Sequence, residues 1–530
     1  MDFAIVGIFK RSVTIERKND ERFETALECT VFVEGKEFCR TKRNVITVDG
    51  LEPGREYEIA IREGDAAPVS HTIRTEEESF LLNVRSFGAC GDGKKNDTSA
   101  LQAAIACCPV FGTVYVPAGT YLTGPLFLKS RMSLWIDEGA VLLGDTDRTH
   151  YPVLPGMTRG LYDNEKEYNL SSWEGNPLDS FASLITALDA EELSIIGRGT
   201  IDGNAQNADW WQEPKKKRIA WRPKLVSLIR CRKVRMQGLT LTNSACWCVH
   251  PYYSEQVDFL DLTIRNPSDS PNTDGFDPES CEGVRMLGST ISVGDDCVAI
   301  KSGKLYMARF HYKETKNVVI RNCRLERGHG SVTVGSEVAG GVRNVHVSQC
   351  IFSGTDRGVR IKTRRGRGER SFLTELTFEN ITMDHVHMPV TINMFYFCDP
   401  DGHTEYVQSQ EKMPVDYRTP HIGSITVRNA ELSGVDASLL CAFGLPEAPV
   451  ERIVLEDIRA SYLEEGKRTP QCPIMMDDFP KLSGRSLYIK NVEVLEVKDV
   501  ILDGLSEEAP YLEGIGEQQL EGFLRRMPEG

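Results

Sequence analysis

Apolar and polar residues alternate along most of this chain with a period of two, which is the pattern of β-strands buried on one face. In the N-terminal part the alternation is clear in residues 27–33 and 57–61, and turn residues separate such runs. We therefore predict a small β-sandwich over residues 1–76. The same period continues through the rest of the chain, so the protein as a whole is predicted to be all-β.

One segment of the predicted sandwich has a recognisable sequence. Residues 51–57 read Leu-Glu-Pro-Gly-Arg-Glu-Tyr. They resemble the Leu-x-Pro-Gly-x-x-Tyr signature of fibronectin type III domains, in which the tyrosine hydroxyl holds a corner of the sandwich. A sandwich of this kind carries no chemistry by itself, so we expect a spacer or docking role.

A second domain is predicted over residues 80–515, after the charged linker 74–78. Near its start, residues 96–105 combine Asn, Asp, Thr and Ser with a following apolar stripe, which predicts an N-capped amphipathic helix. We expect this helix to cover the end of a larger fold.

From about residue 190 a loose repeat recurs at a period within the range of about 20 to 50 residues that repeat folds use. Apolar residues occupy positions 1, 3, 6 and 8 of the repeat, and a turn residue occupies position 5. Copies begin at Val234, Val257, Val284, Val318, Val345, Leu376, Ile425, Ile453 and Leu487. Position 5 is Gly238, Asp261, Gly288, Asn322, Gln349, Asn380, Asn429, Asp457 and Asn491 in turn.

Two short strands joined by a bend and repeated with variable loops are what one coil of a parallel β-helix requires, because each strand pairs only with the coils above and below it. Helical patterns are nearly absent between the copies, which disfavours a βαβ fold. A propeller would need a more regular period. The second domain is therefore predicted to be a parallel β-helix.

Net charge restricts the possible partners. The formal charge of -15 disfavours a general binder of nucleic acid or of anionic membranes, since both attract basic proteins. An anionic ligand would need a local group of basic residues. No stretch approaches the roughly 18 apolar residues of a membrane helix.

The cysteines and the N-terminus both favour the cytoplasm. Fifteen cysteines are scattered along the chain without a paired metal-ligand spacing, which favours free, mostly buried thiols. Asp2 precedes the first apolar run, and Lys10 and Arg11 follow it, which reverses the charge order of a signal peptide.

Four polar motifs follow four consecutive repeats. They are Asn272-Thr273-Asp274, Gly294-Asp295-Asp296, Gly328-His329-Gly330 and Arg360-Ile361-Lys362. Asp295 lies 11 residues after Val284, and His329 lies 11 residues after Val318, so the two should be equivalent on adjacent coils. Stacked strands are about 4.8 Å apart, which predicts that these side chains share one face.

Clustered carboxylates next to basic residues fit the hydrolysis of an acidic sugar. Glycoside hydrolysis needs one protonated carboxyl to donate to the leaving oxygen and one ionised carboxylate. Crowding of like charges raises one pKa and so creates the acid. An arginine and a lysine would hold the carboxylate of a substrate.

The ordered set of four motifs resembles the signature of the family 28 glycoside hydrolases, the polygalacturonases, over roughly residues 80–500. The resemblance implies a right-handed parallel β-helix that hydrolyses α-1,4-linked galacturonate with inversion, without metal or cofactor. The related branch that cleaves rhamnogalacturonan lacks part of the set, so a homogalacturonan substrate is expected. Rhamnogalacturonan and xylogalacturonan remain alternatives.

The resemblance also implies roles for single residues. Asp295 would be the general acid, Asp274 and Asp296 would position and deprotonate the water, and His329 would tune the acid or contact sugar. Arg360 and Lys362 would bind a galacturonate carboxylate, and Asn272 would orient a neighbouring carboxylate or the sugar.

Several further features bear on substrate binding. Long segments at about 145–190 and 395–420 could close one end of the cleft, which favours exo action on imported oligogalacturonates. The arginines between Arg357 and Arg370 suggest either more carboxylate subsites or a solvated basic loop. Trp247, beside His250 and Pro251, could stack on a sugar or belong to the core.

Two other classes of protein remain possible on the sequence. A pectate lyase shares the β-helix but eliminates with calcium and an arginine base, which the Asp pair beside His329 fits less well. In a non-catalytic carbohydrate-binding or adhesive β-helix, the aspartates would be turn residues.

Overall fold

The computed structural model describes residues 2–160, 166–505 and 509–526, so short parts of the predicted second domain and of its first long insertion lie outside the described residues. The N-terminal part folds as two antiparallel sheets. One has the order β1-β2-β5 and the other β4-β3-β6-β7. The strands are β1 (Asp2–Ile8), β2 (Val13–Lys18), β3 (Glu24–Val33), β4 (Lys36–Arg43), β5 (Val45–Val48), β6 (Glu56–Glu63) and β7 (Val69–Arg74).

Alternate residues of both sheets fill the space between them, and Ile15, Val31 and Ile59 are fully buried there. The hydroxyl of Tyr57 accepts a hydrogen bond of 2.9 Å from the backbone N–H of Glu52. The tyrosine therefore fixes the 51–57 corner of the sandwich.

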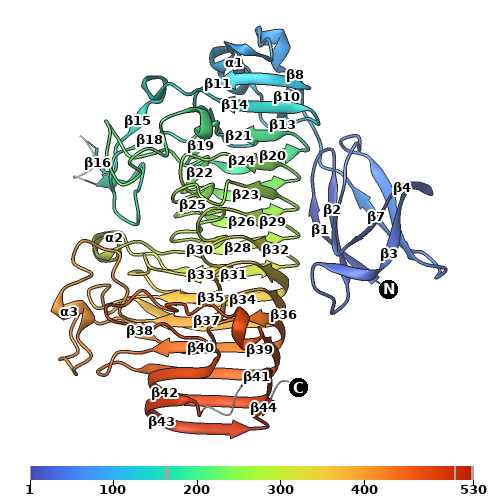
Figure 1. Cartoon of the computed structure of the whole chain (residues 1–530). Helices are drawn as coiled ribbons and strands as arrows, with labels where there is room; N and C mark the ends of the chain where they lie inside the picture. The colour runs from blue at the N-terminus through green and yellow to red at the C-terminus, as the bar shows by residue number, and fades with distance from the viewer. Residues whose placement is uncertain (1, 161–165, 506–508, 527–530) are drawn as a thin grey trace.

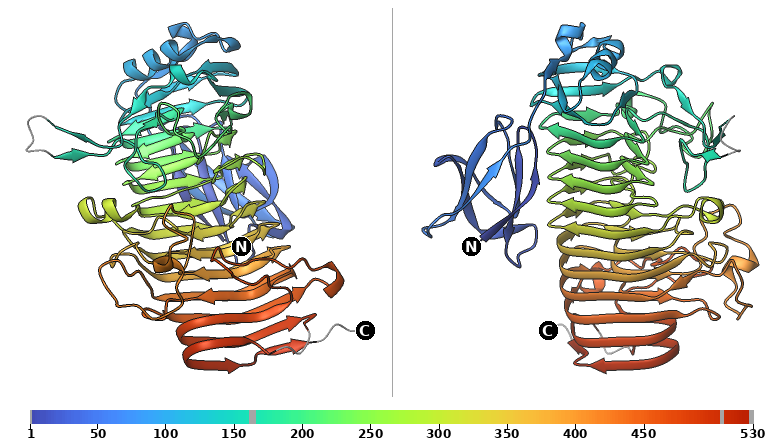
Figure 2. Two further views of the ribbon diagram at one scale, coloured as in Figure 1. Left: turned by 60° about the vertical axis from the view of Figure 1, so that its left-hand side comes forward. Right: turned by 180° about the vertical axis from the view of Figure 1, so that it is seen from behind.

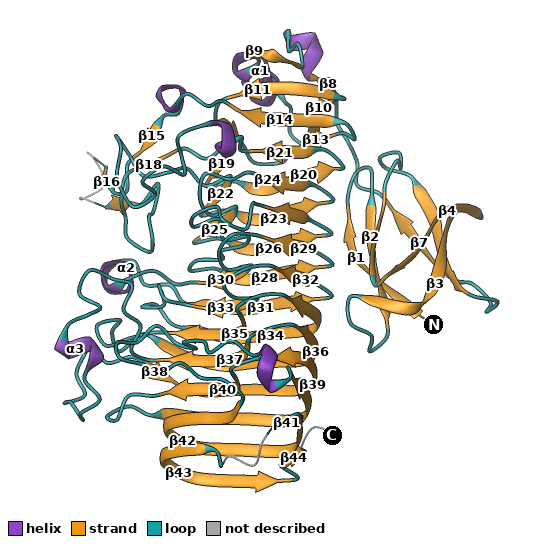
Figure 3. Cartoon of the chain, viewed as in Figure 1, coloured by secondary structure: helices purple, strands orange, loops and turns teal. Residues whose placement is uncertain are grey.

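The rest of the chain winds into a right-handed parallel β-helix with three faces (Figures 1 and 3). The first face contains β8 (Leu81–Asn83), β10 (Gly112–Val116), β13 (Met132–Ile136), β20 (Glu191–Gly197), β23 (Arg232–Gln237), β26 (Glu255–Leu260), β28 (Glu282–Leu287) and β31 (Thr315–Arg321). The second face contains β9 (Asp92–Asn96), β11 (Gly119–Thr123), β14 (Ala140–Gly144), β21 (Thr200–Asp202), β24 (Thr240–Thr242), β27 (Thr263–Arg265), β29 (Thr290–Ser292), β32 (Arg324–Glu326) and β44 (Leu524–Arg526).

In the later coils one long strand bends across these two faces. Such strands are β34 (Val342–Ser353), β36 (Phe372–Asp384), β39 (Ser424–Val435) and β41 (Val450–Tyr462). The third face contains β12 (Leu126–Leu128), β19 (Ile185–Leu188), β22 (Val226–Ile229), β25 (Val249–Tyr252), β30 (Val298–Ile300), β33 (Val332–Val334), β35 (Arg357–Lys362), β37 (Met388–Asn393) and β40 (Ser438–Phe443). The strand β42 (Arg485–Asp503) begins on the third face and continues on the first. The strand β43 (Tyr511–Glu521) spans the third and first faces beside β42.

The predicted repeat matches the coils of the helix. The first residues of the copies from Val234 to Ile453 pair with one another in register and are at most 1% exposed. The bend residues from Gly238 to Asp457 all have positive φ, between 49° and 77°. Glycine, asparagine and aspartate tolerate this left-handed conformation best, which explains the residues found at position 5.

The last predicted copy is placed wrongly. Leu487 pairs with Leu440 on the third face, whereas Ile453 pairs with Leu495. The coil before it is longer than its neighbours, so the next bend of this corner is Asp499 (φ 52°). Asn491 also bends left-handed (φ 56°), but at another corner.

The helix α1 (Thr98–Cys107) covers the N-terminal end of the β-helix, as expected, and buries Leu101, Ala104 and Ile105 (Figure 1). The Asp97 side chain does not cap it. It accepts hydrogen bonds of 2.8 Å from the N–H groups of Cys90 and Gly91, while the Asn96 side chain accepts from Thr98. Without α1 over this end of the β-helix, the apolar side chains of the first coil would be exposed to water.

The sandwich lies against the corner where the first and second faces meet, as the views in Figures 1 and 2 agree. It contacts the bend residues themselves. Asn322 donates to Glu16 (2.8 Å) and accepts from Asn44 (3.0 Å). Similar contacts join Asp261 and Gly288 to Arg43, Gln349 to Asn19 and Glu21, and Asn380 to Arg22 and Asp20. The sandwich is thus docked on five consecutive coils.

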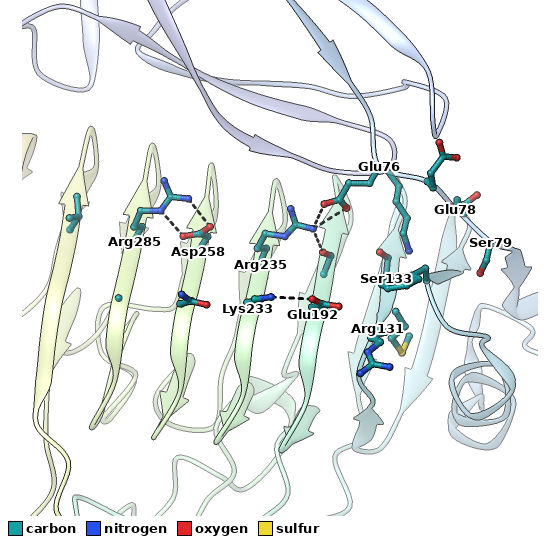
Figure 4. Close-up of a pocket in the computed structure, with 18 of the residues that line it drawn as sticks. Glu76, Glu78, Ser79, Arg131, Ser133, Glu192, Lys233, Arg235, Asp258 and Arg285 are labelled. Atoms are coloured by element: carbon teal, nitrogen blue, oxygen red, sulfur yellow. Dashed lines mark hydrogen bonds and ion pairs between the residues drawn. The ribbon is translucent and has the colours of Figure 1, made fainter.

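A cavity of about 1230 Å³ lies between the linker at Glu76–Ser79 and the first face of the β-helix (Figure 4). Its charged groups pair with one another across neighbouring coils. Arg235 contacts Glu76 at 2.7 Å, and Lys233 contacts Glu192 at 3.2 Å. Because these charges neutralise each other locally, the cavity offers no excess charge for an ionic ligand.

The long insertions project on the side away from the sandwich (Figure 1). The first contains β15 (Val153–Leu154), β16 (Thr158–Arg159), β17 (Glu167–Tyr168) and β18 (Ser180–Phe181), and the second contains α3 (Glu405–Gln408). The helix α2 (Leu305–Phe310) lies between them, and four 3-10 turns complete the described elements: η1 (Val84–Phe87), η2 (Arg148–His150), η3 (Ala205–Asn207) and η4 (Glu465–Lys467). The two-residue strand β38 (His421–Ile422) pairs with β36. None of the helices in the described residues is long and apolar enough to cross a membrane.

Candidate active site

The candidate site lies where the third face is interrupted. Between β25 and β30 the chain contributes no strand to this face, only isolated bridges of Phe276 to Val249 and Val298 and of Glu279 to Tyr252 and Lys301. Asp274 comes two residues before Phe276, and Asp296 comes two residues before Val298, so they stack on adjacent coils. The N–H of Gly275 donates to the carbonyl of Asp296 at 3.0 Å.

The same register brings Asp295 and His329 together. Val298 pairs with Val332, and each side chain comes three residues before its strand position. The N–H of His329 donates to the carbonyl of Asp295 at 3.0 Å. This is the placement that their equal 11-residue offsets predict.

The three aspartates form one compact cluster. Asp274, Asp295 and Asp296 each place a carboxylate oxygen within 4.8 Å of the others. Asp274 and Asp296 are buried, while Asp295 is half-buried and is the most accessible of the three. Three like charges this close cannot all ionise at low cost, so their pKa values must separate.

Asp296 is the member that stays ionised. One of its oxygens accepts from Arg360 and the other from Lys362, both at 2.9 Å. Burial alone would raise the pKa of Asp296, but the ammonium of Lys362 and the guanidinium of Arg360 hold that pKa well below its usual range. Because both oxygens already bind cations, a metal ion at this cluster would have to displace them.

Asp274 shows the opposite behaviour. Burial, followed by the negative charge of Asp295, raises the pKa of Asp274 to about 7, although Lys301 opposes the rise. The Lys301 ammonium lies 3.7 Å from Asp274. Carboxylate oxygens of Asp274 and Asp295 lie within 4.8 Å of each other, so the proton that Asp274 holds near neutral pH can be shared between the two carboxyls.

His329 lies at the open edge of the cluster. Its Nδ1 contacts the Asp356 carboxylate at 2.7 Å. This hydrogen bond raises the pKa of His329. Burial alone would raise the pKa of Asp356, but the hydrogen bond with His329 lowers it. A protonated histidine could contact an acidic sugar or act on Asp295.

Asn272 is held by a residue that the motifs do not include. Its side-chain oxygen accepts a hydrogen bond of 2.7 Å from Arg222, and its backbone is left-handed (φ 55°). Arg222 also donates to the carbonyls of Ala245 and Pro271. Asn272 is therefore fixed beside the aspartates.

Two expected substrate contacts are corrected by the structure. Trp247 is 5% exposed, and the Lys301 ammonium lies 4.4 Å from its ring centroid, so this ring supports Lys301 and offers no face to a sugar. Arg357 donates to the carbonyls of Pro473 (2.8 Å) and Cys472 (3.1 Å). Its guanidinium therefore fixes the 472–475 loop beside the site.

The arginines after Lys362 are neither carboxylate subsites nor a solvated loop. Arg364 pairs with Asp399 and Asp401, and the buried Arg365 pairs with Glu447 at 2.6 Å. Arg367 also pairs with Asp399, at 2.7 Å. Arg365 also donates to the carbonyls of Tyr406 and Ser409. Through these contacts the arginines anchor the second insertion to the β-helix, and the sequence alone cannot distinguish such anchors from a ligand site.

Sequence reasoning missed three buried charged residues beneath the cluster. Asp277 and Glu337 contact Lys301 at 3.6 and 3.2 Å. A usable signal existed, because Asp277 and Lys301 follow apolar runs on the third face, where a charge needs a partner.

Comparison with known proteins identifies the family of the chain. The model of glycosyl hydrolases family 28 matches residues 114–438. A probable polygalacturonase of Vitis vinifera is 30% identical over 395 residues, which cover 72% of this chain and 75% of the relative.

The chain belongs to glycosyl hydrolases family 28. An exo-poly-alpha-D-galacturonosidase of Dickeya chrysanthemi is 26% identical over 72% of this chain and 69% of its own length. The solved structure of the family 28 exopolygalacturonase of Yersinia enterocolitica has the same fold. It aligns with a TM-score of 0.67 at 19% identity over 99% of this chain and 98% of its own chain.

Proposed function

We propose that this protein hydrolyses α-1,4-galacturonosidic bonds of oligogalacturonates or polygalacturonate. The observation that carries the proposal is the division of charge within the cluster. Asp296 is held ionised by two cations, while the buried Asp274, beside Asp295, retains a proton near neutral pH. Hydrolysis of a glycoside needs this combination of one base and one acid.

In the proposed reaction Asp295, the most accessible carboxyl, donates its proton to the leaving oxygen. Asp296 accepts a proton from the attacking water, whose oxygen bonds to the anomeric carbon. Asp274 helps to hold that water. Arg360 and Lys362 lie beside Asp296 and would bind the carboxylate of the sugar next to the scissile bond.

The stereochemical outcome needs its own measurement. The family resemblance implies inversion. The carboxylate oxygens lie within 4.8 Å of one another, whereas inverting enzymes usually separate their carboxyl groups by about 6.5–9.5 Å. Proton NMR of the first product formed distinguishes the two outcomes: a β-anomer supports inversion, and an α-anomer shows retention.

We further propose exo action. The two insertions meet beside the site through Lys304, whose N–H donates to Gly175 and whose ammonium pairs with Asp399 at 2.8 Å. Trp173 of the first insertion stacks on Trp221, and Arg222 lies over its ring. This arrangement would close one end of the cleft, and the relative from Dickeya chrysanthemi carries an exo-acting name.

The product profile on polygalacturonate and on tetragalacturonate tests the proposal. Release of monomer or dimer alone, with little loss of viscosity, supports exo hydrolysis. A ladder of oligomers contradicts exo action but keeps the hydrolase. Absence of release from both substrates, with release from rhamnogalacturonan or xylogalacturonan, moves the substrate to those polymers, and an absorbance rise from unsaturated uronate identifies a lyase.

We also propose that the N-terminal sandwich is a fibronectin type III-like domain with a docking role and that the enzyme works in the cytoplasm. The Tyr57 corner supports the first part. All fifteen cysteines are free and ten are buried, which suits a reducing compartment. Fractionation of the producing cells tests the location, and recovery of the enzyme outside the cytoplasm contradicts it.

A further inference from the structure

A carboxyl group without a donor lies directly beneath the catalytic cluster. Asp277 is completely buried, and neither of its oxygens receives a hydrogen bond from an N–H group or a hydroxyl among the described residues. Its carboxyl and that of Asp274 flank the same ammonium, because Lys301 lies 3.6 Å from Asp277 and 3.7 Å from Asp274. A buried carboxylate normally accepts several hydrogen bonds, so an ionised Asp277 would be costly here.

The nearby cations do not compensate for a charge on Asp277. Lys301 lies 3.6 Å from it, but the same ammonium lies closer to Glu337, at 3.2 Å. Although burial opposes it, Lys301 with Lys304 and Arg367 lowers the pKa of Glu337 to about 2, so Glu337 is ionised. Arg360 and Lys362 are bound to Asp296.

The other groups around Asp277 have partners of their own or are neutral. Lys224, before β22, donates to the carbonyl of Ser172. His250, which aligns with Asp277 on β25, contacts Glu279 at 2.9 Å. The Cys248 thiol is buried, and burial raises its pKa. Asp274 and Asp277 are thus two carboxyls that share part of one cation.

We propose that Asp277 is a positioning residue that stays protonated and donates its carboxyl proton to Asp274, which leaves the shared catalytic proton on Asp295. A hydrogen bond from Asp277 stabilises the ionised form of Asp274. The proton of the pair then resides on the accessible member, next to the leaving oxygen. Burial of Asp277, followed by the charge of Asp274, raises its pKa well above the usual range, in agreement with this assignment.

This inference rests on the proposed function, and two variants of Asp277 test it. Asp277→Leu removes the donor, so the proton moves to the buried Asp274. We expect kcat on trigalacturonate to fall about 100-fold while KM changes less than about twofold, since acid catalysis contributes about 10² to 10⁴-fold. Asp277→Asn keeps a neutral donor and should recover most of this loss.

A substrate with a better leaving group distinguishes this positioning role from a purely structural one. A nitrophenyl galacturonide departs without needing a proton, so Asp277→Leu should act on it nearly as fast as the wild type. A structural defect would slow both substrates alike. Ser438→Ala is the matched control, because it alters another fully buried polar group of the third face that has no hydrogen-bond partner. It should change the rate on neither substrate.

Three results would overturn the inference. One is an Asp277→Asn enzyme as slow as Asp277→Leu. Another is an equal loss on both substrates. The third is a shift of the alkaline limb of the pH–rate profile to lower pH by about one unit in Asp277→Asn. Such a shift would mean that an ionised Asp277 had been neutralised.

A measurement on the wild type tests the inference even if the variants fail to fold, and it does not depend on activity. Carbon-13 NMR of labelled aspartate carboxyls, about two pH units above the usual aspartate pKa, should find two protonated groups in this protein. One belongs to the pair of Asp274 and Asp295, and the other is Asp277. A single protonated group contradicts the inference, whereas absence of sugar release by the wild type contradicts only the proposed function.

Discussion

Two rows of polar residues run along this β-helix, and they differ in how far their side chains find hydrogen-bond partners. The bend residues under the sandwich, such as Asn322, have their side chains satisfied by the docked domain. The residues of the third face, such as Asp274 and Asp277, crowd like charges with few donors. The coil spacing of about 4.8 Å is the same in both rows.

The difference shows how a repeat fold separates stability from chemistry. In the first row each polar group gains a hydrogen bond, which contributes about 1 kcal/mol. In the second row the carboxyls are crowded and unequally satisfied, since Asp296 binds two cations whereas Asp277 has no donor. Such crowding shifts their pKa values and makes them reactive. Substitutions should therefore affect activity in one row and stability in the other.

The largest effect is expected at Asp296. Asp296→Asn removes the base and leaves Arg360 and Lys362 buried without their anion. We expect the hydrolysis rate to fall by at least about 10³-fold and the protein to lose about 3 kcal/mol of stability. Initial rates and thermal unfolding measure both, and unchanged stability would contradict the buried ion pairs.

The next largest effect is expected at Lys362, and Lys304 provides the control. Lys362→Met removes one partner of Asp296, so the pKa of Asp296 rises and the acid limb of kcat/KM moves to higher pH, with about a 100-fold loss of rate. Lys304→Met breaks a comparable pair with Asp399. This control should leave the acid limb in place, and a shift in both variants would contradict a specific role.

The pH profile of the wild type tests the division of charge directly. Below about pH 7 Asp274 retains the proton that it can share with Asp295, and this proton is lost as the pH rises through the Asp274 pKa of about 7. We expect kcat/KM to fall about tenfold per pH unit on that side. On the acid side the low pKa of Asp296 should keep the base ionised to below the usual aspartate range. A rise in activity between about pH 7 and about pH 9 would contradict this assignment.

The smallest effect on activity is expected at the docked row. Asn322→Ala removes hydrogen bonds to the sandwich, whereas Asn429→Ala alters a bend of nearly the same φ (49° against 54°) that has no hydrogen bond to the sandwich among the described residues. Asn322→Ala should cost about 2 kcal/mol more. Thermal melting compares the two variants, and equal losses would show that the hydrogen bonds of Asn322 to the sandwich contribute nothing to stability. Neither variant should change kcat.

The architecture could be predicted from the sequence because the β-helix repeats its pattern. The copies from Val234 to Ile453 pair as expected, and the position of Asp295 beside His329 follows from counting. The copy at Leu487 was misplaced because a long loop shifts the count by one face, so that Leu487 lies on the third face and Leu495 takes the expected position. Counting works only while successive coils keep the same corners.

The electrostatic partners could not be read from the sequence, because they come from separate coils and insertions. Asp277 lies 3.6 Å from the Lys301 ammonium, and Arg365 pairs with Glu447, which is distant in the chain. The direction of the pKa shifts depends on these contacts. Crowding was expected to create an acid, but only the structure shows that the raised pKa falls on Asp274 and not on Asp296.

The central claim is that the carboxylate cluster of the third face performs the hydrolysis. Release of reducing ends from polygalacturonate by the wild type and by Asp295→Asn, at equal thermal stability, tests it most directly. The account predicts steady release by the wild type and a loss of at least about 10³-fold in the variant. Equal rates in the two proteins would contradict it, because Asp295 could then not be the proton donor.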